Sequence, residues 1–313
     1  MESRDVAMAE IAMVGLGRMG GNMARRLRRG GIRVAALNRS FEVTQKLAEE
    51  TGLTACRDYA HLVAQLAAPR VIWLMLPAGN ATEEAMGQLL PLLGKGDVLI
   101  NGANAFYKES QSQAETAAKH GVAYVDAGVS GGVWGLANGY ALMVGGEKGA
   151  VARIERFIKV LAPGEDKGWL HCGPVGSGHF VKMIHNGIEY GMMQAYAEGL
   201  ALMKGKEEFS LDLAAITEMW RHGSVVRSWL LDLAAEFLQG DQQLDAIEPF
   251  VSDSGEGRWT ALEAVEQGIP APVMSLALMM RFASQGKNDY PAKLLAMMRK
   301  GFGGHAVKEG GES

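Results

Sequence analysis

Three glycines in the order Gly-x-Gly-x-x-Gly stand near the start of the chain, between an apolar run and a helical pattern. The apolar run is Glu10–Val14, and the helical pattern continues to about Arg29. In this context Gly15 permits a tight turn, Gly17 lets the backbone approach a pyrophosphate, and Gly20 allows the helix to pack closely on the strand. Because the N-terminus of the helix then faces the anion, the motif predicts a Rossmann-type unit that binds a dinucleotide.

The second predicted strand, Arg33–Leu37, ends in Asn38-Arg39-Ser40. Rossmann domains that bind NAD usually place Asp or Glu here, about 20 residues further on, to hold the ribose 2′-hydroxyl. This chain has an asparagine instead, and the guanidinium that follows suits a 2′-phosphate by charge and by bidentate geometry. These residues favour NADP over NAD, with a plain surface role for Arg39 as the alternative. Ser40 is also the expected N-cap of a helix that runs to Thr51.

Apolar strands and helical patterns continue to alternate up to about residue 172. The further predicted strands are Val71–Leu76, Asp97–Ile100, Ala123–Ala127, Ala141–Val144 and Trp169–Cys172. Strands that alternate with helices form a parallel sheet that is covered on both faces. We therefore expect an α/β fold, with a Rossmann-like dinucleotide-binding domain at residues 1–176, of which residues 1–9 form a loose tail.

Polar, glycine-rich loops follow three of these strands, at the sheet edge where ligands bind in such folds. They are Pro77–Asn80, Asn101–Asn104 and Gly128–Gly132. The last loop exposes backbone N–H groups, and the side chains of Asn104 and Ser130 add donors. A carboxylate or a sugar hydroxyl suits such a loop; a simple turn is the alternative.

A long helical pattern, about Ser177–Lys204, follows a turn-rich segment. One face of it carries Lys182, His185, Asn186 and Glu189, at spacings of three, four and seven residues. This face offers a base, an acid and two hydrogen-bonding groups, although a solvated, salt-bridged surface is the alternative interpretation. The neighbouring stripe is apolar and is expected to be core; it consists of Val181, Ile184, Ile188, Met192 and Ala195.

The rest of the chain has helical periodicity without a strand pattern. The expected helices are about Asp212–Trp220, Val225–Gln239, Trp259–Gln267, Val273–Gln285 and Ala292–Lys300. We therefore expect an all-helical second domain at residues 177–313. The glycine-rich segment Arg299–His305 is predicted to extend rather than to continue the helix.

Composition and charge exclude several classes of protein. A chain of 313 residues exceeds what one core usually supports, and a net charge of -4 gives no basic footprint for nucleic acid. No apolar run reaches the roughly 18–20 residues that span a membrane. Cys56 and Cys172 form no Cys-x-x-Cys pair and no secretion signal precedes the first strand, so we expect a cytoplasmic protein with reduced thiols. No cluster has metal-ligand spacing, so no metal is expected.

These segments resemble the β-hydroxyacid dehydrogenases in the glycine turn Gly15–Gly20, in the loop Val129–Gly132 and in Lys182 on the long helix. The longer match Gly178–Tyr190, with the sequence GHFVKMIHNGIEY, is more specific. It is similar to the 6-phosphogluconate dehydrogenases, the decarboxylating enzymes of the pentose phosphate route. The resemblance covers about Ile11–Ala306, and the length is similar to the short bacterial form, which lacks the duplicated helical half of the long form.

The resemblance implies oxidative decarboxylation of 6-phosphogluconate, a sugar-acid phosphate, with hydride transfer to NADP or NAD. Lys182 matches the general base and Glu189 the general acid. Met19 matches a residue beside the nicotinamide, and Asn38-Arg39-Ser40 matches the NADP-type motif. The positions that match substrate contacts are Asn104 (also near the cofactor), Ser130, Gly131, Gly132, His185, Asn186, Tyr190 and Arg281, the last for the phosphate. Arg299 and His305 match a tail pair that reaches the active site of a neighbouring subunit, which implies a homo-oligomer, dimer or tetramer, with shared sites.

One departure from the family pattern concerns the phosphate. In the long form, a lysine and a threonine help to hold the phosphate in the loop that aligns with Ser254 and Glu256 here. A carboxylate beside a phosphate is repulsive unless a cation intervenes. Two alternatives therefore stay open: a β-hydroxyacid dehydrogenase acting on a small unphosphorylated 3-hydroxy acid, and a non-catalytic NADP-sensing protein. The sensor predicts loss of Lys182 or Glu189, and both residues are present.

Overall fold

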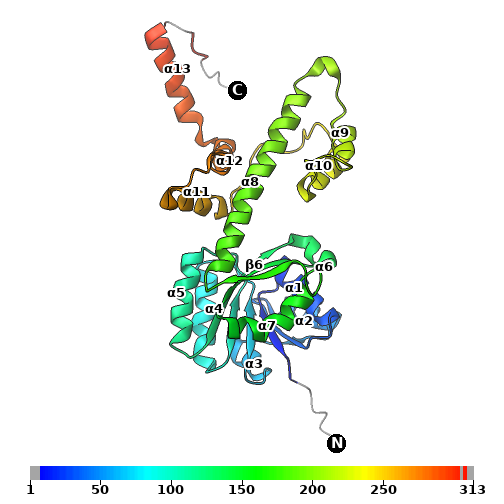
Figure 1. The fold of residues 1–313 in the computed structure, drawn as a ribbon, viewed down its shortest axis with the longest axis vertical. Helices are drawn as coiled ribbons and strands as arrows, with labels where there is room; N and C mark the ends of the chain where they lie inside the picture. The colour runs from blue at the N-terminus through cyan, green and yellow to red at the C-terminus, as the bar shows by residue number, and fades with distance from the viewer. Residues whose placement is uncertain (1–7, 304–305, 309–313) are drawn as a thin grey trace, which may run out of the picture. The chain divides into compact units, whose positions relative to one another are not determined.

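The computed structural model describes residues 8–303 and 306–308. The chain divides into two compact units, Met1–Met183 and Ile184–Ser313 (Figure 1). The helix α8, Ser177–Lys204, begins in the first unit and ends in the second.

An eight-stranded sheet forms the centre of the first unit, in the order β3-β2-β1-β4-β5-β6-β7-β8. The strands are β1 Ile11–Val14, β2 Val34–Leu37, β3 Thr54–Ala55, β4 Val71–Leu74, β5 Val98–Asn101, β6 Ala123–Ser130, β7 Ala141–Gly146 and β8 Trp169–Gly173. Neighbouring strands are parallel except β6 and β7, which are antiparallel. The connection between β6 and β7 is shorter than the dozen or more residues that a parallel crossover needs, so the chain turns back on itself.

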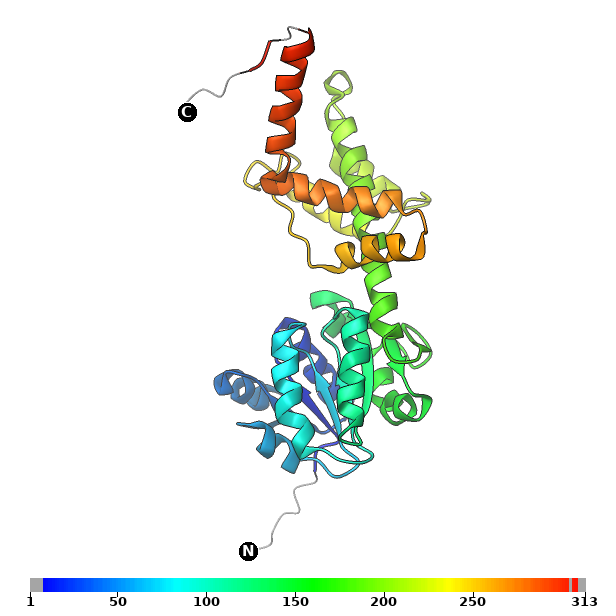
Figure 2. The same ribbon diagram turned by 90° about the vertical axis from the view of Figure 1, so that its left-hand side faces the viewer.

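Strand side chains alternate between two cores, one on each face of the sheet. On β1, Ile11 and Met13 lie in one core, whereas Ala12 and Val14 lie in the other. The first core is covered by α1 (Arg18–Arg29), α2 (Phe41–Thr51) and α7 (Lys148–Leu161), and the second by α3 (Tyr59–Ala64), α4 (Asn80–Leu89) and α5 (Tyr107–Ala118) (Figure 1, Figure 2). Coverage on both faces explains why the predicted strands are continuous apolar runs.

Several details of the first unit differ from the sequence-based expectation. The edge strand β3 and the helix α3 were not predicted, because two strand residues are too few to give a period. Ala9 was expected in a loose tail, yet it pairs with Leu66, and its N–H donates to the carbonyl oxygen of Gln65 (2.9 Å). Short helical turns follow α4 and β6; they are η1 Leu90–Leu92, η2 Gly132–Trp134 and α6 Gly135–Asn138.

The described part of the second unit is helical and contains no strand, which confirms the predicted fold class. After α8 come η3 Glu207–Phe209, α9 Leu213–Trp220, α10 Trp229–Gly240, α11 Glu256–Gln267, α12 Pro272–Phe282, the π-helical turn η4 Ala283–Lys287 and α13 Asp289–Gly303. A small core joins α8 to α12 through Tyr190, Ala277 and Leu278. Among residues 8–303 and 306–308, no helix is both long enough and apolar enough to span a bilayer.

The predicted core stripe of α8 is wrong. Val181, Ile188 and Met192 are exposed, whereas Met183 and Tyr190 are buried. The buried face is fixed by a close helix crossing, where a β-carbon on Gly187 would lie 2.6 Å from Cγ2 of Thr260 on α11. A small residue permits this approach, so packing rather than the densest apolar stripe decides which face is covered.

The predicted extension of the chain after Arg299 is also wrong for the residues that are described. α13 continues through Gly301 to Gly303. Glycine costs only about 1 kcal/mol relative to alanine within a helix, and no proline interrupts this segment to end it. His305 lies outside the described residues.

Candidate active site

The three motif glycines between β1 and α1 have separate steric roles. Gly15 has a φ of +90°, and a β-carbon there would lie 2.4 Å from the carbonyl oxygen of Met75. A β-carbon on Gly20 would lie 2.1 Å from the carbonyl oxygen of Gly15. A β-carbon on Gly17 would meet nothing within 4 Å. Gly15 and Gly20 therefore serve the turn and the packing, and only Gly17 opens onto free space.

The start of α1 fits the pyrophosphate of a dinucleotide. Gly17 is the N-cap, no side chain caps the helix, and its first turn holds no acidic residue. The first N–H groups of the helix are therefore available to an anion, and the helix dipole favours negative charge there. Met19 is half-buried against the core under this turn.

The end of β2 holds the predicted cofactor-specificity residues. Asn38 Oδ1 accepts the N–H of Leu16 (3.0 Å), so Asn38 is fastened to the glycine turn. Arg39 is exposed. Ser40 is the N-cap of α2, as predicted, but its hydroxyl donates to Glu42 (3.0 Å) instead of capping the helix. Asn38 therefore ties the end of β2 to the glycine turn, and the exposed Arg39 follows it in the chain.

Asn104 holds the end of β6 in place. It has a φ of +52°, its Nδ2 donates to the carbonyl oxygen of Val129 (3.0 Å), and its Oδ1 accepts the N–H of Val129 (2.8 Å). A carboxamide has two donor hydrogens and two acceptor lone pairs, so one of each remains for a ligand. The structure thus gives Asn104 a positioning task that the sequence did not predict.

The loop after β6 is open on one side. Ser130 ends the strand and is half-buried, and Gly131 and Gly132 have φ of +134° and +52°. A β-carbon on Gly132 would meet nothing within 4 Å. Such a turn of successive glycines leaves backbone N–H groups directed at whatever occupies that space.

Lys182 is packed against the same strand. The residue is 5% exposed, although lysine is seldom buried. A β-carbon on Gly128 would lie 2.4 Å from Cβ and 3.0 Å from Cγ of Lys182, so the glycine makes room for the stem of the lysine. Ser130 ends β6 two residues after Gly128. The structure therefore brings Lys182, Asn104 and the glycine loop to one edge of the sheet.

The next turns of α8 carry the other predicted polar residues. His185 Nδ1 lies 3.0 Å from Asn186 Oδ1 and 3.9 Å from Glu189 Oε2. The side chains of His185 and Glu189 are 40% and 38% exposed. Lys182 and Glu189 are seven residues apart, which is two turns, or about 10 Å along the axis.

Tyr190 and Arg281 meet in the second unit. The guanidinium carbon of Arg281, on α12, lies 3.5 Å from the centre of the Tyr190 ring, and Nη1 donates to the carbonyl oxygen of Ser252 (2.7 Å). The hydroxyl of Tyr190 accepts the N–H of Ser254 (3.2 Å). The remaining guanidinium N–H groups of Arg281 suit an anion.

Glu256, in the loop that aligns with the phosphate loop of the long form, is buried and hydrogen-bonded. It is 8% exposed, and the hydroxyl of Ser254 donates a short hydrogen bond to its Oε2. The hydroxyl of Ser254 also lies 3.4 Å from that of Tyr190. Ser254 and Glu256, the residues that depart from the long-form pattern, therefore form a chain of hydrogen bonds that leads to Tyr190.

Arg299 is an exposed residue of α13, and no contact joins it to Arg281 or Tyr190 within the described residues.

Two groups that the sequence analysis missed are Asp126 and His179, both fully buried where α8 begins. Their signal was an acid inside the otherwise apolar segment of β6, because a buried carboxylate requires specific partners. The described residues contain no group of three His, Cys, Asp or Glu that could hold a metal ion.

Comparison with known families matches both halves of the chain. The model described as the NAD binding domain of 6-phosphogluconate dehydrogenase matches residues 10–173. The model described as the C-terminal domain of 6-phosphogluconate dehydrogenase matches residues 178–300.

Individual relatives agree with these family matches. The chain is 38% identical over 299 residues to an NAD(+)-dependent, decarboxylating 6-phosphogluconate dehydrogenase of Haloferax volcanii, with 95% of this chain and 98% of that protein covered. It is 34% identical over 292 residues to an NADP(+)-dependent, decarboxylating enzyme of Bacillus subtilis, with 90% of this chain and 62% of that protein covered. The solved 6-phosphogluconate dehydrogenase of Plasmodium falciparum, described with NADP+ and with 6-phosphogluconate, superposes with a TM-score of 0.82 at 29% identity, over 97% of this chain and 67% of that one. The chain belongs to the 6-phosphogluconate dehydrogenase family.

Proposed function

We propose that this protein oxidises and decarboxylates 6-phosphogluconate to ribulose 5-phosphate and CO2, with hydride transfer to NADP. The observation that carries the proposal is the pair Lys182 and Glu189, two turns apart on α8, in a chain that matches both domains of the family. The relatives from Haloferax volcanii and Bacillus subtilis, named above, support decarboxylating activity.

Lys182 would act as the base. Bound nicotinamide supplies the hydride acceptor, and the amine of Lys182 takes the hydroxyl proton as the C–H hydride leaves the substrate. The resulting ammonium then donates a hydrogen bond to the new ketone oxygen and stabilises the charge that forms there as the carboxylate departs as CO2. Burial of the lysine stem keeps the amine in a fixed place for both steps.

Glu189 would complete the reaction. The enediol that remains after loss of CO2 needs a proton on carbon, and a carboxylic acid on the same helix face can donate it. His185, 3.9 Å from Glu189, together with Asn186 would hold substrate hydroxyls on this face. Asn104 and the loop Ser130–Gly132 would hold the carboxylate end, through the donors described above.

The phosphate would lie at Arg281. Its guanidinium is held by the Tyr190 ring and by the carbonyl oxygen of Ser252, which leaves N–H groups directed outward. In this proposal the Ser254 hydroxyl donates to the Glu256 carboxylate within the loop, and Arg281 supplies the positive charge that meets the phosphate. Arg299 and His305 would add to it from a neighbouring subunit.

NADP is the proposed cofactor, with NAD as a second possibility. Asn38 and Arg39 support NADP, since Arg39 is an exposed guanidinium at the end of β2 and this strand end carries no acid in the usual NAD position. Relatives of both specificities are known, so NAD fits the family as well. The hydroxyl of Ser40 is occupied by Glu42 and would have to turn to reach a phosphate.

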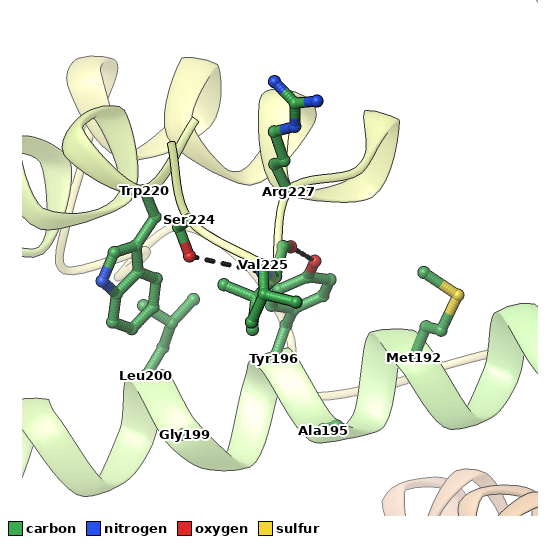
Figure 3. Close-up of a pocket in the computed structure, with 10 residues that line it drawn as sticks. Met192, Ala195, Tyr196, Gly199, Leu200, Trp220, Ser224, Val225 and Arg227 are labelled. Atoms are coloured by element: carbon green, nitrogen blue, oxygen red, sulfur yellow. Dashed lines mark hydrogen bonds between the residues drawn. The ribbon is translucent and has the colours of Figure 1, made fainter. Parts of the chain in front are cut away.

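We also infer a homo-oligomer whose subunits share active sites. The described second unit exposes large apolar side chains, among them Val265 (79%), Val273 (67%) and Leu295 (58%). It also has an open groove of about 550 Å³ between α8 and the end of α9 with the segment that follows, where Trp220 and Val225 face Leu200 and Tyr196 (Figure 3). Large exposed apolar side chains and an apolar groove are typical of a subunit interface, and a second copy of this chain is the proposed occupant.

A substrate screen tests the proposal directly. Oxidation of 6-phosphogluconate, gluconate and small 3-hydroxy acids would be followed at 340 nm, each with NADP and with NAD, together with CO2 release. We expect turnover and CO2 only with 6-phosphogluconate. The buried Glu256, linked through Ser254 to the Tyr190 ring on which Arg281 stacks, favours a second candidate, a dehydrogenase of small unphosphorylated 3-hydroxy acids. Faster turnover of those acids would replace the first proposal by the second.

Mixing two inactive variants tests the shared site. Lys182→Met and His305→Ala would be dissociated mildly, mixed and reassociated. If subunits share sites, some hybrid sites combine an intact Lys182 with an intact His305, and activity returns. If each tail serves its own subunit, every site keeps one lesion and mixing restores nothing.

A further inference from the structure

Asp126 is a residue of β6, and its side chain contacts the start of α8. Its side chain is fully buried. One carboxylate oxygen accepts the N–H of Gly176 (2.7 Å), and the other accepts the N–H of His179 (2.8 Å). Gly176 immediately precedes α8 and His179 is its third residue, so the carboxylate satisfies two of the backbone donors that a helix start leaves unpaired. The positive end of the helix dipole also favours its charge.

The helix start rests directly on the strand backbones around Asp126. A β-carbon on Gly178 would lie 2.4 Å from the carbonyl oxygen of Met143 and 2.6 Å from that of Asp126. A β-carbon on Gly145, the β7 partner of Asp126, would lie 2.5 Å from Asp126 Oδ1. The glycines therefore let the helix and strand backbones meet closely, and the carboxylate of Asp126 bonds the first turn at this contact.

Lys182 belongs to the same contact. Asp126 and Gly128 are two residues apart on β6, so both face the same side of the sheet. His179 and Lys182 are three residues apart on α8, so they share a face of the helix. One turn of α8 therefore contacts β6 at two places. The backbone N–H of His179 donates to Asp126, and the stem of Lys182 packs on Gly128.

The imidazole of His179 fastens the turn from the other side. His179 Nδ1 lies 2.7 Å from Oγ of Ser110 on α5, and both residues are buried. Burial lowers the pKa of His179 while the charge of Asp126 acts in the opposite direction. α5 follows the loop that contains Asn104. The first turn of α8 is therefore bonded both to β6 and to α5.

We propose that Asp126 is a positioning residue, which fixes the first turn of α8 and thereby holds the amine of Lys182 in place beside the loop Val129–Gly132. This inference rests on the proposed role of Lys182 as the base. A displacement of about 1 Å at a reacting group can cost about 100-fold in rate, so loss of the anchor should appear in kcat.

The test variant is Asp126→Asn, and the chain offers a matched control. Asparagine keeps the shape but replaces one acceptor by an NH2 group, which then faces a backbone N–H. Asp97 is also buried and also accepts two backbone N–H groups, from Arg70 (2.7 Å) and Gly94 (3.0 Å), but it precedes β5 at the amino ends of the strands. Asp97→Asn therefore removes a comparable backbone hydrogen bond, and also weakens the ion pair with Arg70 (3.1 Å), far from Lys182.

We expect Asp126→Asn to lower kcat with 6-phosphogluconate about 100-fold, with the Kd for NADP within about threefold of the native value. Asp97→Asn should keep kcat within about threefold. An equal loss in both variants, or a native kcat in Asp126→Asn, would overturn the proposal. If Asp126→Asn does not fold, Asp126→Ser removes the carboxylate and leaves a small acceptor, and an unchanged kcat in that variant would overturn the proposal too.

A readout without turnover separates this inference from the proposed function. The rate of reductive methylation of Lys182 can be followed by mass spectrometry in each variant. Asp126→Asn should raise it several-fold because the buried amine is released, and Asp97→Asn should leave it unchanged. If the native protein does not oxidise 6-phosphogluconate, the proposed function fails, but this labelling still decides whether Asp126 holds Lys182; equal labelling in all three proteins would show that it does not.

Discussion

The guanidinium of Arg281 lies over the ring of Tyr190, with 3.5 Å from its central carbon to the ring centre. The stack and the bond to the carbonyl oxygen of Ser252 hold the arginine without an acid partner of its own among the described residues. An arginine that is held in this way remains available to an anion.

Arg281→Ala should raise the KM for 6-phosphogluconate about 10- to 100-fold, the scale of one or two lost hydrogen bonds to a charged group. Turnover of an unphosphorylated acid, if any is measurable, should stay unchanged. Arg281→Lys should recover only part of the loss, because an ammonium provides neither the stack nor the planar fork. Steady-state kinetics check this. An equal KM in the native protein and in Arg281→Ala would show that Arg281 does not bind the phosphate.

The motif glycines should separate binding from folding. Gly17→Ala adds a β-carbon where the protein has free space, so we expect a native Tm and a Kd for the dinucleotide about 100-fold higher, since the methyl group occupies the place of the pyrophosphate. Gly20→Ala drives a β-carbon against the carbonyl oxygen of Gly15, and should lower the Tm by about 5 °C or more. Calorimetry and cofactor titration measure both, and Gly149→Ala, at another unobstructed position, is the control for a harmless substitution.

Arg39→Ala should weaken NADP binding about 10- to 100-fold and NAD binding less than about threefold, because NAD lacks the group that the guanidinium would meet. Titration with 2′,5′-ADP and with 5′-AMP isolates the contribution of the phosphate. Equal losses of affinity for the two cofactors would show that Arg39 does not contact the 2′-phosphate.

Lys182→Met should abolish turnover while NADP still binds, since the lysine acts on substrate. Glu189→Gln should leave folding intact and lower kcat by about 100-fold or more, the usual scale for one positioned proton donor. Fluorescence titration of the cofactor accompanies the kinetics in both variants. Near-normal turnover in either would make this face of α8 an ordinary solvated surface.

Alkaline pH should destabilise the first unit through Cys56. Burial raises the pKa of the Cys56 thiol to about 11, whereas an unfolded cysteine ionises near pH 8.5. A raised pKa in the folded state means that the stabilising contribution is complete below about pH 8.5 and is lost as the pH rises towards 11. Urea midpoints at pH 7.5 and pH 10 should fall less for Cys56→Ala than for the native protein. Equal declines would contradict the assignment.

The sequence by itself determined the elements whose signal is local. Gly15, Gly17 and Gly20 predicted the turn because their roles depend on backbone φ and on missing β-carbons, which neighbouring residues fix. The continuous apolar strands predicted a sheet that is covered on both faces, since residues of such strands are buried on each side. Lys182 and Glu189 were placed on one helix face by their spacing alone.

The tertiary structure decided everything that depends on contacts between distant segments. No local pattern states that Asn104 binds the backbone of Val129, or that Asp126 anchors residues 50 positions further along. The buried face of α8 was mispredicted because Gly187 admits α11 there, while Val181 and Ile188 stay exposed. Periodicity reports which residues share a face of a helix, but the neighbouring element that covers a face is chosen by close packing, which only the folded chain defines.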